Sequence, residues 1–427
     1  MVGLGKSGLA AARLLLSRGA DVAAADANAA LSPPAGVPLR PLDAQAFRDR
    51  DLVVVSPGVP LAQVLPLAAG LEVMGEVELA SRFVDEPILG VTGTNGKSTT
   101  TALTGHLLVT AGQIAFTGGN LGTPLSQRVL DGGRLDATVC ELSSYQLEGI
   151  VSLRCAAATV LNVTPDHLDR YPDLGAYAAA KARIFENQRA GDLAALNLAD
   201  ARVAAMRTNP GVRRAGFDPR GEPPAGAAAG VAQGVPRSLR VDGRSFELRA
   251  ATLRGTHNAE NALAALLLAG TLVDDAEALQ RGLDTYPGLP HRLEPVRVLA
   301  GVEYVNDSKA TNVDSVEKSL SAFERGVILI LGGRGKGAPY APLRPLLQAR
   351  VKLILTIGED AEKIRDELSD AAPVADCGTL ADAVDLAREK AKAGDTVLLS
   401  PACASYDQFR NFEDRGEQFK RLVRELA

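Results

Sequence analysis

Short runs of apolar residues alternate along the chain with stretches rich in alanine and leucine that have a helical pattern. Apolar runs of this length, bounded by polar or glycine-containing segments, are typical of strands buried on both faces of a parallel sheet. Their alternation with helices predicts an α/β fold with largely parallel sheets. Six runs are expected to be buried strands: residues 51–55, 87–91, 156–161, 327–331, 352–357 and 396–399.

Two segments interrupt this pattern and predict domain boundaries. Residues 82–86 are polar and precede Pro87, and residues 286–290 read YPGLP. Because proline restricts the residue before it and proline–glycine sequences favour turns, both segments are expected to be linkers. They divide the chain into three expected domains, residues 1–82, 83–287 and 288–427. Residues 221–238, rich in Gly, Ala and Pro and without periodicity, are expected to form a surface loop.

The bulk composition restricts the class of protein. With 427 residues, 46% of them hydrophobic, the chain is too long for one core and is expected to form two or three domains. The net charge of −5 is too small to indicate a nucleic-acid or membrane surface. Four cysteines without CxxC spacing argue against a zinc knuckle or disulfide framework and indicate a reducing, cytoplasmic compartment. The sequence predicts neither a signal peptide nor a membrane-spanning segment.

The strongest local motif is GTNGKST, which lies between a predicted strand and a predicted helix. It consists of Gly93, Thr94, Asn95, Gly96, Lys97, Ser98 and Thr99. Glycines let backbone N–H groups surround phosphate oxygens, the lysine places a charge near the β- and γ-phosphates, and a hydroxyl can reach Mg²⁺. Val91 stands where the general GxxxxGK[ST] motif has its first glycine. The strand and helix context nevertheless favours a nucleotide-binding loop over an ordinary glycine turn.

A second glycine motif, GLGKSG at residues 3–8, matches GxGxxG. Asp26 ends the next apolar run, where a ribose-binding carboxylate stands in dinucleotide-binding folds. By itself the motif is compatible with a dinucleotide oxidoreductase, with a site for another diphosphate, or with a structural turn. The phosphate loop farther along the chain favours the second of these.

Three isolated side chains follow or accompany predicted strands in the central region. Glu141 ends the strand before ELSSYQLE, and a carboxylate at the end of a parallel strand suits Mg²⁺. His167 follows a proline turn in NVTPDHLDRY, and Lys181 lies in a helical, alanine-rich run. Taken alone, each of the three is better explained as an ordinary solvated or structural side chain.

Polar residues are also dense in five later segments. These are residues 255–261, 290–294, 306–312, 332–337 and 400–409. The last three come directly after β-rich runs, where an α/β domain places its binding loops. Such density is atypical of plain surface loops and predicts ligand contacts.

Taken in order, these segments resemble the Mur ligases, a family of three-domain ATP-dependent amino-acid ligases that build the peptidoglycan stem peptide. The resemblance covers nearly the whole chain. It rests on GTNGKST, ELSSYQLE, NVTPDHLDRY, the helix of Lys181, THNAENALAA, LPHRLE, NDSKATN and LSPACASYDQF. The ELSSYQLE, NDSKATN and SPACAS segments are most similar to those of the family members that add D-glutamate.

The resemblance implies a substrate for each domain. UDP-N-acetylmuramoyl-L-alanine is expected to contact Gly5, Lys6, Ser7, Ser56, Pro57, Gly58, Asn120, Ser143 and Gln146. ATP is expected to contact the seven residues of the phosphate loop together with Asn258, Arg292 and Asp307. D-glutamate is expected to contact Lys309, Thr311, Ser405 and Phe412.

The same resemblance implies the catalytic groups and the fold of each domain. Lys97, Glu141, His167 and Lys181 are expected to be catalytic, and two Mg²⁺ ions to be held by Ser98, Glu141, His167 and Lys181, the last as a carbamate. A carbamate turns the ammonium into an oxygen ligand suited to a hard cation. The expected domains are a Rossmann-like UDP-binding domain, a P-loop ATPase-like domain with a mostly parallel sheet, and a Rossmann-like C-terminal domain. The enzyme is expected to be a monomer that makes an acyl phosphate.

The chain departs from the family pattern at a few positions. Only Met1 and Val2 precede Gly3, so the first strand is expected to lack its beginning. Ala27 and Asn28 stand where relatives often have larger residues, and Arg334 and Tyr406 replace an acid and an aliphatic residue. The alternatives are another Mur ligase, a folylpolyglutamate synthetase, and an NAD-dependent oxidoreductase based on the first glycine motif.

Overall fold

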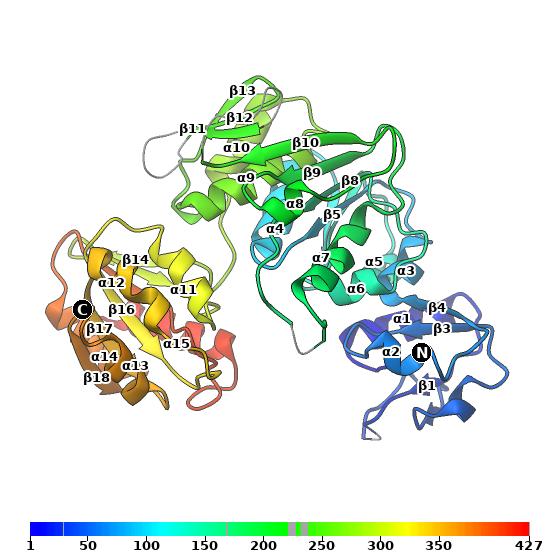
Figure 1. Cartoon of the computed structure of the whole chain (residues 1–427), viewed down its shortest axis with the longest axis horizontal. Coiled ribbons are helices and arrows are strands. Elements are labelled where there is room, and N and C mark those ends of the chain that lie inside the picture. The colour runs from blue at the N-terminus through cyan, green and yellow to red at the C-terminus, as the bar shows by residue number, and fades with distance from the viewer. Residues whose placement is uncertain (29, 168–169, 221–227, 232–237, 427) are drawn as a thin grey trace. The chain divides into compact units, whose positions relative to one another are not determined.

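The computed structural model describes residues 1–28, 30–167, 170–220, 228–231 and 238–426 (Figure 1). The chain forms two compact units. The first contains Met1–Val231, Ser238–Glu247 and Glu260–Thr285, and the second contains mainly residues 248–259 and 286–426. Residues 1–82 thus share a unit with the central region, and the predicted domain boundaries stay predictions. No helix among the described residues is long and apolar enough to cross a membrane.

Residues 1–82 form a small parallel sheet with three helices. Strands β1 (Ala24–Ala25) and β2 (Leu39–Arg40) pair in parallel, as do β3 (Leu52–Val55) and β4 (Glu72–Gly75). Val2 forms parallel β-bridges with Ala25 of β1 and with Val55 of β3. The glycine-rich turn that follows Val2 therefore lies beside the end of β3. The helices are α1 (Lys6–Ser17), α2 (Leu61–Val64) and α3 (Glu76–Ser81).

The central region is built on a nine-stranded sheet with the order β13-β12-β11-β10-β9-β8-β5-β7-β6. All neighbouring pairs from β6 to β11 are parallel, and β11, β12 and β13 are antiparallel. The strands are β5 (Ile88–Thr92), β6 (Ala115–Gly119), β7 (Ala137–Glu141), β8 (Ala157–Val160), β9 (Leu193–Asn197), β10 (Arg213–Asp218), β11 (Ala228–Val231), β12 (Ser238–Val241) and β13 (Arg244–Glu247). The helices are α4 (Lys97–Thr110), α5 (Leu125–Asp131), α6 (Ser144–Glu148), α7 (Leu174–Ala182), α8 (Ala201–Ala204), α9 (Thr256–Ala269) and α10 (Ala276–Thr285).

The C-terminal region contains a six-stranded sheet with the order β14-β15-β19-β16-β17-β18, parallel except for β14. The strands are β14 (Glu294–Leu299), β15 (Val302–Asn306), β16 (Val327–Gly332), β17 (Val351–Ile357), β18 (Val374–Gly378) and β19 (Thr396–Leu399). The helices are α11 (Val313–Leu320), α12 (Arg344–Arg350), α13 (Ala361–Leu368), α14 (Leu380–Lys390) and α15 (Phe412–Glu425), and the yellow-to-red part of Figure 1 shows them around the sheet.

Strand β16 shows why the apolar runs become buried strands. Every residue of VILILG is buried. Val327, Leu329 and Leu331 belong to a core cluster with residues of α11, α12 and α13, whereas Ile328 and Ile330 belong to another with residues of α14 and α15. Because side chains of a strand alternate between faces, a continuous apolar run is required where helices cover both faces.

The strands expected from the apolar runs are confirmed as β3, β5, β8, β16, β17 and β19, with ends shifted by at most one residue. The loop expected at residues 221–238 is wrong in part. Ala228–Val231 forms β11, which pairs with β10 and β12, because its backbone completes the hydrogen bonding between them. Residues 221–227 and 232–237 lie outside the described residues.

Candidate active site

The predicted phosphate loop connects β5 to α4 and is held by a neighbouring loop. The backbone N–H of Asn95 donates to Oδ1 of Asn162 at 2.8 Å, and Nδ2 of Asn162 donates to the carbonyl of Asn95 at 3.2 Å. The hydroxyl of Thr94 accepts from the backbone of Thr164 at 3.1 Å. These bonds hold the loop at the start of α4, the end of a helix at which anions such as phosphate are favoured.

Gly96 is the helix N-cap and adopts a φ of 84°. A Cβ atom there would lie 2.3 Å from Oδ1 of Asn261, whose side chain also accepts from the hydroxyl of Thr100 at 3.2 Å. Glycine is therefore required both by the backbone conformation and by the close approach of Asn261. Lys97, the next residue, donates to the carbonyls of Gly93 at 3.0 Å and Thr94 at 2.9 Å. Ser98 and Thr99 are half-buried in the first turn of α4.

Glu141 ends β7, next to β5 in the sheet, as the sequence predicts. Its side chain is buried, with 2% of its surface exposed. Oε1 accepts from Nδ2 of Asn120 at 2.7 Å, whereas Oε2 is buried and has no hydrogen-bond partner among the described residues. A buried carboxylate oxygen without a donor is costly, so its presence beside the phosphate loop points to a cation or donor supplied by a ligand.

The residues around Glu141 fit a magnesium site of the kind found in nucleotide enzymes. Among the described residues, no three His, Cys, Asp or Glu side chains are grouped closely enough to hold a metal by themselves. Mg²⁺ in phosphate sites commonly uses one or two carboxylates and completes its shell with phosphate oxygens and water. Oε2 of Glu141 and the hydroxyl of Ser98 are suitable protein ligands for such an ion.

His167 lies in the loop after β8, with its backbone in the left-handed region at φ 55°. The hydroxyl of Tyr145 and Nδ1 of His167 are 2.8 Å apart and share a hydrogen bond. Tyr145 lies on α6, and its ring also packs 3.9 Å from the guanidinium carbon of Arg170. The tyrosine therefore holds the imidazole in one orientation and leaves Nε2 on the opposite side of the ring.

Lys181 lies on α7 and is buried, with 1% of its surface exposed. Nζ donates to the carbonyl of Gly93 at 2.7 Å and lies 4.4 Å from the centre of the Tyr177 ring. Burial, and secondarily the charge of Lys97, lowers the pKa of Lys181 to about 6. The amine is thus mostly neutral at pH 7 or above, which is the form that can react with carbon dioxide.

A cavity of about 310 Å³ brings many of the predicted residues together. Its lining comprises Pro57, Gly58, Lys97, Asn120, Ser143, Ser144, Tyr145, His167, Tyr177 and Lys181. Ser144, Tyr145 and Tyr177 were missed by reasoning from the sequence. The spacing of Tyr177 and Lys181, four residues apart on one helix, is the signal that places both on the same face.

The predicted UDP-contacting residues of the first region lie at the carboxyl ends of neighbouring strands. Gly5, Lys6 and Ser7 start α1 after Val2, and Ser56 follows β3, which Val2 bridges. Nζ of Lys6 donates to the carbonyl of Gly122 in the central region. These residues therefore lie at the same edge of the small sheet as Pro57 and Gly58, which line the cavity. Their contacts with the substrate stay predictions.

Two other residues predicted to contact the UDP substrate have a structural role. Ser143 is the N-cap of α6, and its backbone N–H donates to Oε1 of Gln146 at 2.9 Å in a capping box. Ser143 still lines the cavity, while Gln146 is buried with 3% of its surface exposed. The capping box orients the start of α6, and with it Tyr145.

Asp26 is engaged by the backbone of its own region. Oδ2 accepts from the N–H of Leu4 at 2.8 Å, and Oδ1 accepts from the N–H of Asn28 at 2.8 Å. Both oxygens thus stabilise the glycine-rich turn and the loop after β1. These bonds give Asp26 a structural role in this turn, so its position does not by itself indicate a ribose.

In the second compact unit, three segments carry the predicted D-glutamate contacts at the carboxyl ends of β15 and β19. Nζ of Lys309 lies 3.7 Å from the centre of the Phe412 ring, and the N–H of Thr311 donates to the carbonyl of Lys309 at 2.9 Å. Ser405, with 2% of its surface exposed, follows β19. The neighbouring strand β16 ends in the loop of Arg334, which pairs with Glu359 at 2.8 Å. This edge therefore carries at least two cationic side chains and a hydroxyl.

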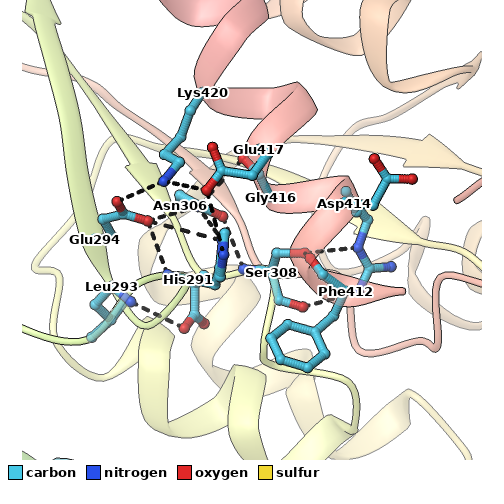
Figure 2. Close-up of polar contacts among 12 residues, drawn as sticks. His291, Leu293, Glu294, Asn306, Ser308, Phe412, Asp414, Gly416, Glu417 and Lys420 are labelled. Atoms are coloured by element: carbon cyan, nitrogen blue, oxygen red, sulfur yellow. Dashed lines mark hydrogen bonds and ion pairs between the residues drawn. The ribbon is translucent and has the colours of Figure 1, made fainter. Parts of the chain in front are cut away.

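A polar network joins His291, Glu294 and Asn306 (Figure 2), and it also reaches the backbone of Lys309. Nδ2 of Asn306 donates to Nδ1 of His291 at 3.0 Å and to Oε2 of Glu294 at 2.9 Å, and the carbonyl of His291 accepts from the N–H of Lys309 at 3.1 Å. A Cβ atom at Gly416 would lie 2.1 Å from Nδ1 of His291. Glycine at position 416 thus lets α15 approach His291, and the network fixes the backbone at Lys309.

The residues predicted to contact the nucleotide from this unit are largely buried. Nδ2 of Asn258 donates to the carbonyl of Arg254 at 2.9 Å. Oδ2 of Asp307 accepts from the hydroxyls of Ser319 at 2.6 Å and Ser400 at 2.7 Å. Burial raises the pKa of Asp307 to about 6, although these hydrogen bonds and the charge of Arg292 act to lower it. Their roles toward ATP stay predictions.

Three models of protein-family domains match the chain. The Mur ligase MurD-like N-terminal domain matches residues 1–75, the Mur ligase middle domain matches residues 91–269, and the Mur ligase glutamate ligase domain matches residues 291–403. The chain belongs to the Mur ligase family. The family and the α/β fold class predicted from the motifs are thereby confirmed.

Relatives and solved structures of the family match nearly the whole chain. A UDP-N-acetylmuramoylalanine--D-glutamate ligase from Myxococcus xanthus is 54% identical over 99% of this chain and 97% of its own length. The enzyme of that name from Anaeromyxobacter dehalogenans is 53% identical over 100% of this chain and 97% of its own. The structure of the UDP-N-acetylmuramate-alanine ligase MurC from Thermotoga maritima, 19% identical, covers 99% of this chain and 98% of its own with a TM-score of 0.62. The latter likeness concerns the fold alone.

Proposed function

We propose that this ligase uses ATP to join D-glutamate to UDP-N-acetylmuramoyl-L-alanine through an acyl phosphate, a step in making the peptidoglycan precursor. The observation that carries the proposal is the cavity that places Lys97, His167 and Lys181 beside Asn120, the partner of Glu141. The two D-glutamate ligases named above, 54% and 53% identical over 97% of their length, support D-glutamate as the amino acid.

The chemistry explains why the cavity needs these charges. A carboxylate does not react with an amine at neutral pH, because its charge repels nucleophiles and its oxygen leaves poorly. Transfer of the γ-phosphoryl group of ATP to the L-alanyl carboxylate produces an acyl phosphate, which the amine of D-glutamate attacks as phosphate leaves. The first step joins two anions, so it depends on charge neutralisation and alignment. Lys97 supplies one charge, turning from the carbonyls of Gly93 and Thr94 to the phosphates.

Magnesium would be held by Glu141 and Ser98, with His167 and Lys181 as further candidates. When bound, Mg²⁺ supplies positive charge that stabilises the transferring phosphoryl group. The unpartnered Oε2 of Glu141 supports its role as a ligand, since Asn120 leaves that oxygen available. Tyr145 orients His167 through Nδ1, and Nε2, which lies 3.6 Å from Oδ2 of Asp166, is the nitrogen proposed to contact a ligand.

We further propose that Lys181 carries a carbamate. The support is physical: an amine attacks carbon dioxide only when neutral, and burial with the charge of Lys97 lowers the pKa of Lys181 to about 6. The carbamate places oxygen atoms beside the phosphate loop, where the free lysine has only a nitrogen, and oxygen is the ligand suited to Mg²⁺. Two metal ions are proposed from the resemblance to the family.

D-glutamate would bind at the edge formed by Lys309, Thr311, Ser405 and Phe412. The substrate has two carboxylates, and a site that fixes its orientation needs donors at two separated places. Lys309 is a point charge for one of them, and the hydroxyls and backbone N–H groups around Ser405 serve the other. With both carboxylates held, the L-isomer directs its amine away from the acyl phosphate, and a misplacement of about 1 Å costs roughly 10²-fold in rate.

The proposed place of action is the cytoplasm, with the enzyme acting as a monomer. All four cysteines are free, which suits a reducing compartment.

The decisive experiment measures phosphate release with ATP, Mg²⁺ and UDP-N-acetylmuramoyl-L-alanine while the amino acid is varied. D-glutamate should support turnover. Equal turnover with L-glutamate, L-lysine or meso-diaminopimelate would assign the chain to another function within the family.

A further inference from the structure

Arg415 lies in the first turn of α15. It is the largest fully buried side chain among the described residues, with 0% of its surface exposed. Its guanidinium makes several hydrogen bonds. Nε donates to the hydroxyl of Ser308 at 3.0 Å, and one terminal nitrogen donates to the carbonyls of Ser308 at 3.0 Å and Cys403 at 3.1 Å. The other lies 3.5 Å from the carbonyl of Ala404.

These bonds join the three segments that carry the proposed amino-acid site. Ser308 directly precedes Lys309, and Cys403 and Ala404 directly precede Ser405. Ser308 is also tied to the start of α15, because its hydroxyl donates to the carbonyl of Phe412 at 2.8 Å (Figure 2). A planar guanidinium can hold several acceptors in one fixed geometry, which a flexible ammonium cannot do. Arg415 therefore sets the spacing between Lys309 and Ser405.

The charge of Arg415 has no carboxylate bonded to it. None of the ion pairs among the described residues includes Arg415, and its hydrogen-bond acceptors are carbonyls and a hydroxyl. Burial lowers its pKa to about 10, with Cys403 and Asp407 as the acidic groups that oppose the shift, so the guanidinium is charged at neutral pH. A buried cation without a bonded anion is unfavourable, and a ligand carboxylate nearby would offset this cost.

We propose that Arg415 is a positioning residue for the amino-acid substrate, holding the loops of Lys309 and Ser405 in register while its charge is balanced by the carboxylates of bound D-glutamate. This inference rests on the proposed function and adds to it a residue that does not touch the reacting atoms. Its influence is directed to the amino-acid substrate, because its acceptors adjoin Lys309 and Ser405, whereas the side chain of Asp307 is held by Ser319 and Ser400. ATP and UDP-substrate binding should therefore be nearly independent of Arg415.

The test compares Arg415→Met and Arg415→Lys with Arg421→Met, a control at an exposed position of the same helix. Kinetic constants are measured for all three substrates, and thermal unfolding is recorded for each variant. Arg415→Met should raise the KM for D-glutamate about tenfold or more, the effect of losing one nearby charge, and leave the KM for ATP within about twofold. Arg415→Lys keeps the charge but loses the planar guanidinium with its fixed donors. Its KM for D-glutamate should therefore lie between those of the wild type and Arg415→Met.

A merely structural role would lower the thermal stability and kcat while moving all three KM values together. That outcome, or a folded Arg415→Met protein with an unchanged KM for D-glutamate, would overturn the proposal. If Arg415→Met does not fold, Arg415→Lys decides, since a KM for D-glutamate equal to that of the wild type refutes the requirement for the guanidinium. Wild-type enzyme without D-glutamate-dependent phosphate release would instead refute the proposed function.

Discussion

Replacing Glu141 by Gln keeps the shape of the side chain and removes its charge. In the native site, Oε1 accepts from Asn120 at 2.7 Å, and Oε2 is buried without a hydrogen-bond partner among the described residues. Gln can still accept from Asn120, but it places an amide NH₂ where a cation is proposed to bind. We therefore expect Glu141→Gln to lose turnover by about 10²-fold or more, the usual effect of removing one preorganised group that stabilises transferring charge.

The same substitution should affect stability in the opposite direction. An unsatisfied buried polar atom costs about 1–3 kcal/mol, and more when it is charged. The Gln amide is also unpaired there but carries no charge, so the ligand-free protein should be more stable by about 1 kcal/mol, which raises the melting temperature by about 2–4 °C. A loss of activity together with a gain in stability is characteristic of a residue whose partner is a ligand.

The assay combines phosphate release over a Mg²⁺ titration with thermal unfolding of the ligand-free protein. Glu186→Gln serves as the matched control, because Glu186 is 48% exposed and pairs with Arg183 on the surface. Turnover of Glu141→Gln within tenfold of the wild type at an unchanged Mg²⁺ requirement would refute the metal assignment. A lower melting temperature would show that Oε2 is satisfied within the protein.

Four further outcomes are expected. Lys97→Ala should reduce turnover by about 10²-fold or more while leaving the Kd of UDP-N-acetylmuramoyl-L-alanine unchanged by calorimetry, and normal turnover would contradict the ATP site. Lys181→Ala should be inactive and partly rescued by a small carboxylic acid, and ¹³CO₂-treated wild type should show a carbamate NMR signal that this variant lacks. Lys309→Ala should raise the KM for D-glutamate far more than that for ATP, whereas an unchanged value would show that the amino-acid pocket lies elsewhere. Since burial raises the pKa of Asp307 from 3.8 to about 6, the folded state holds a proton between these values that the unfolded state lacks. The buried carboxylate therefore costs stability above pH 6, and this cost is lost as pH falls toward 4. In urea unfolding, Asp307→Asn should gain about 2 kcal/mol more over the wild type at pH 7.5 than at pH 4.5, and equal differences would refute the shift.

Local pattern determined much of the fold. The runs that became β5, β16 and β19 were recognisable because strands covered by helices on both faces must be apolar throughout. The phosphate loop was recognisable for a related reason, since its geometry depends on glycine and lysine at fixed local spacing between a strand and a helix. Strand β11 was missed because an Ala/Gly-rich segment has no apolar alternation, and its pairing with β10 and β12 depends on the tertiary fold.

The properties that make the candidate site reactive were decided by residues distant in sequence. Nothing in ELSSYQLE indicates that Asn120 binds one oxygen of Glu141 and leaves the other buried without a donor. The low pKa of Lys181 arises from burial and from Lys97, and both depend on the folding of α7 over the phosphate loop. Desolvation and Coulomb interactions act through space, so the chemistry of a side chain in a core depends on neighbours that only the tertiary structure brings together.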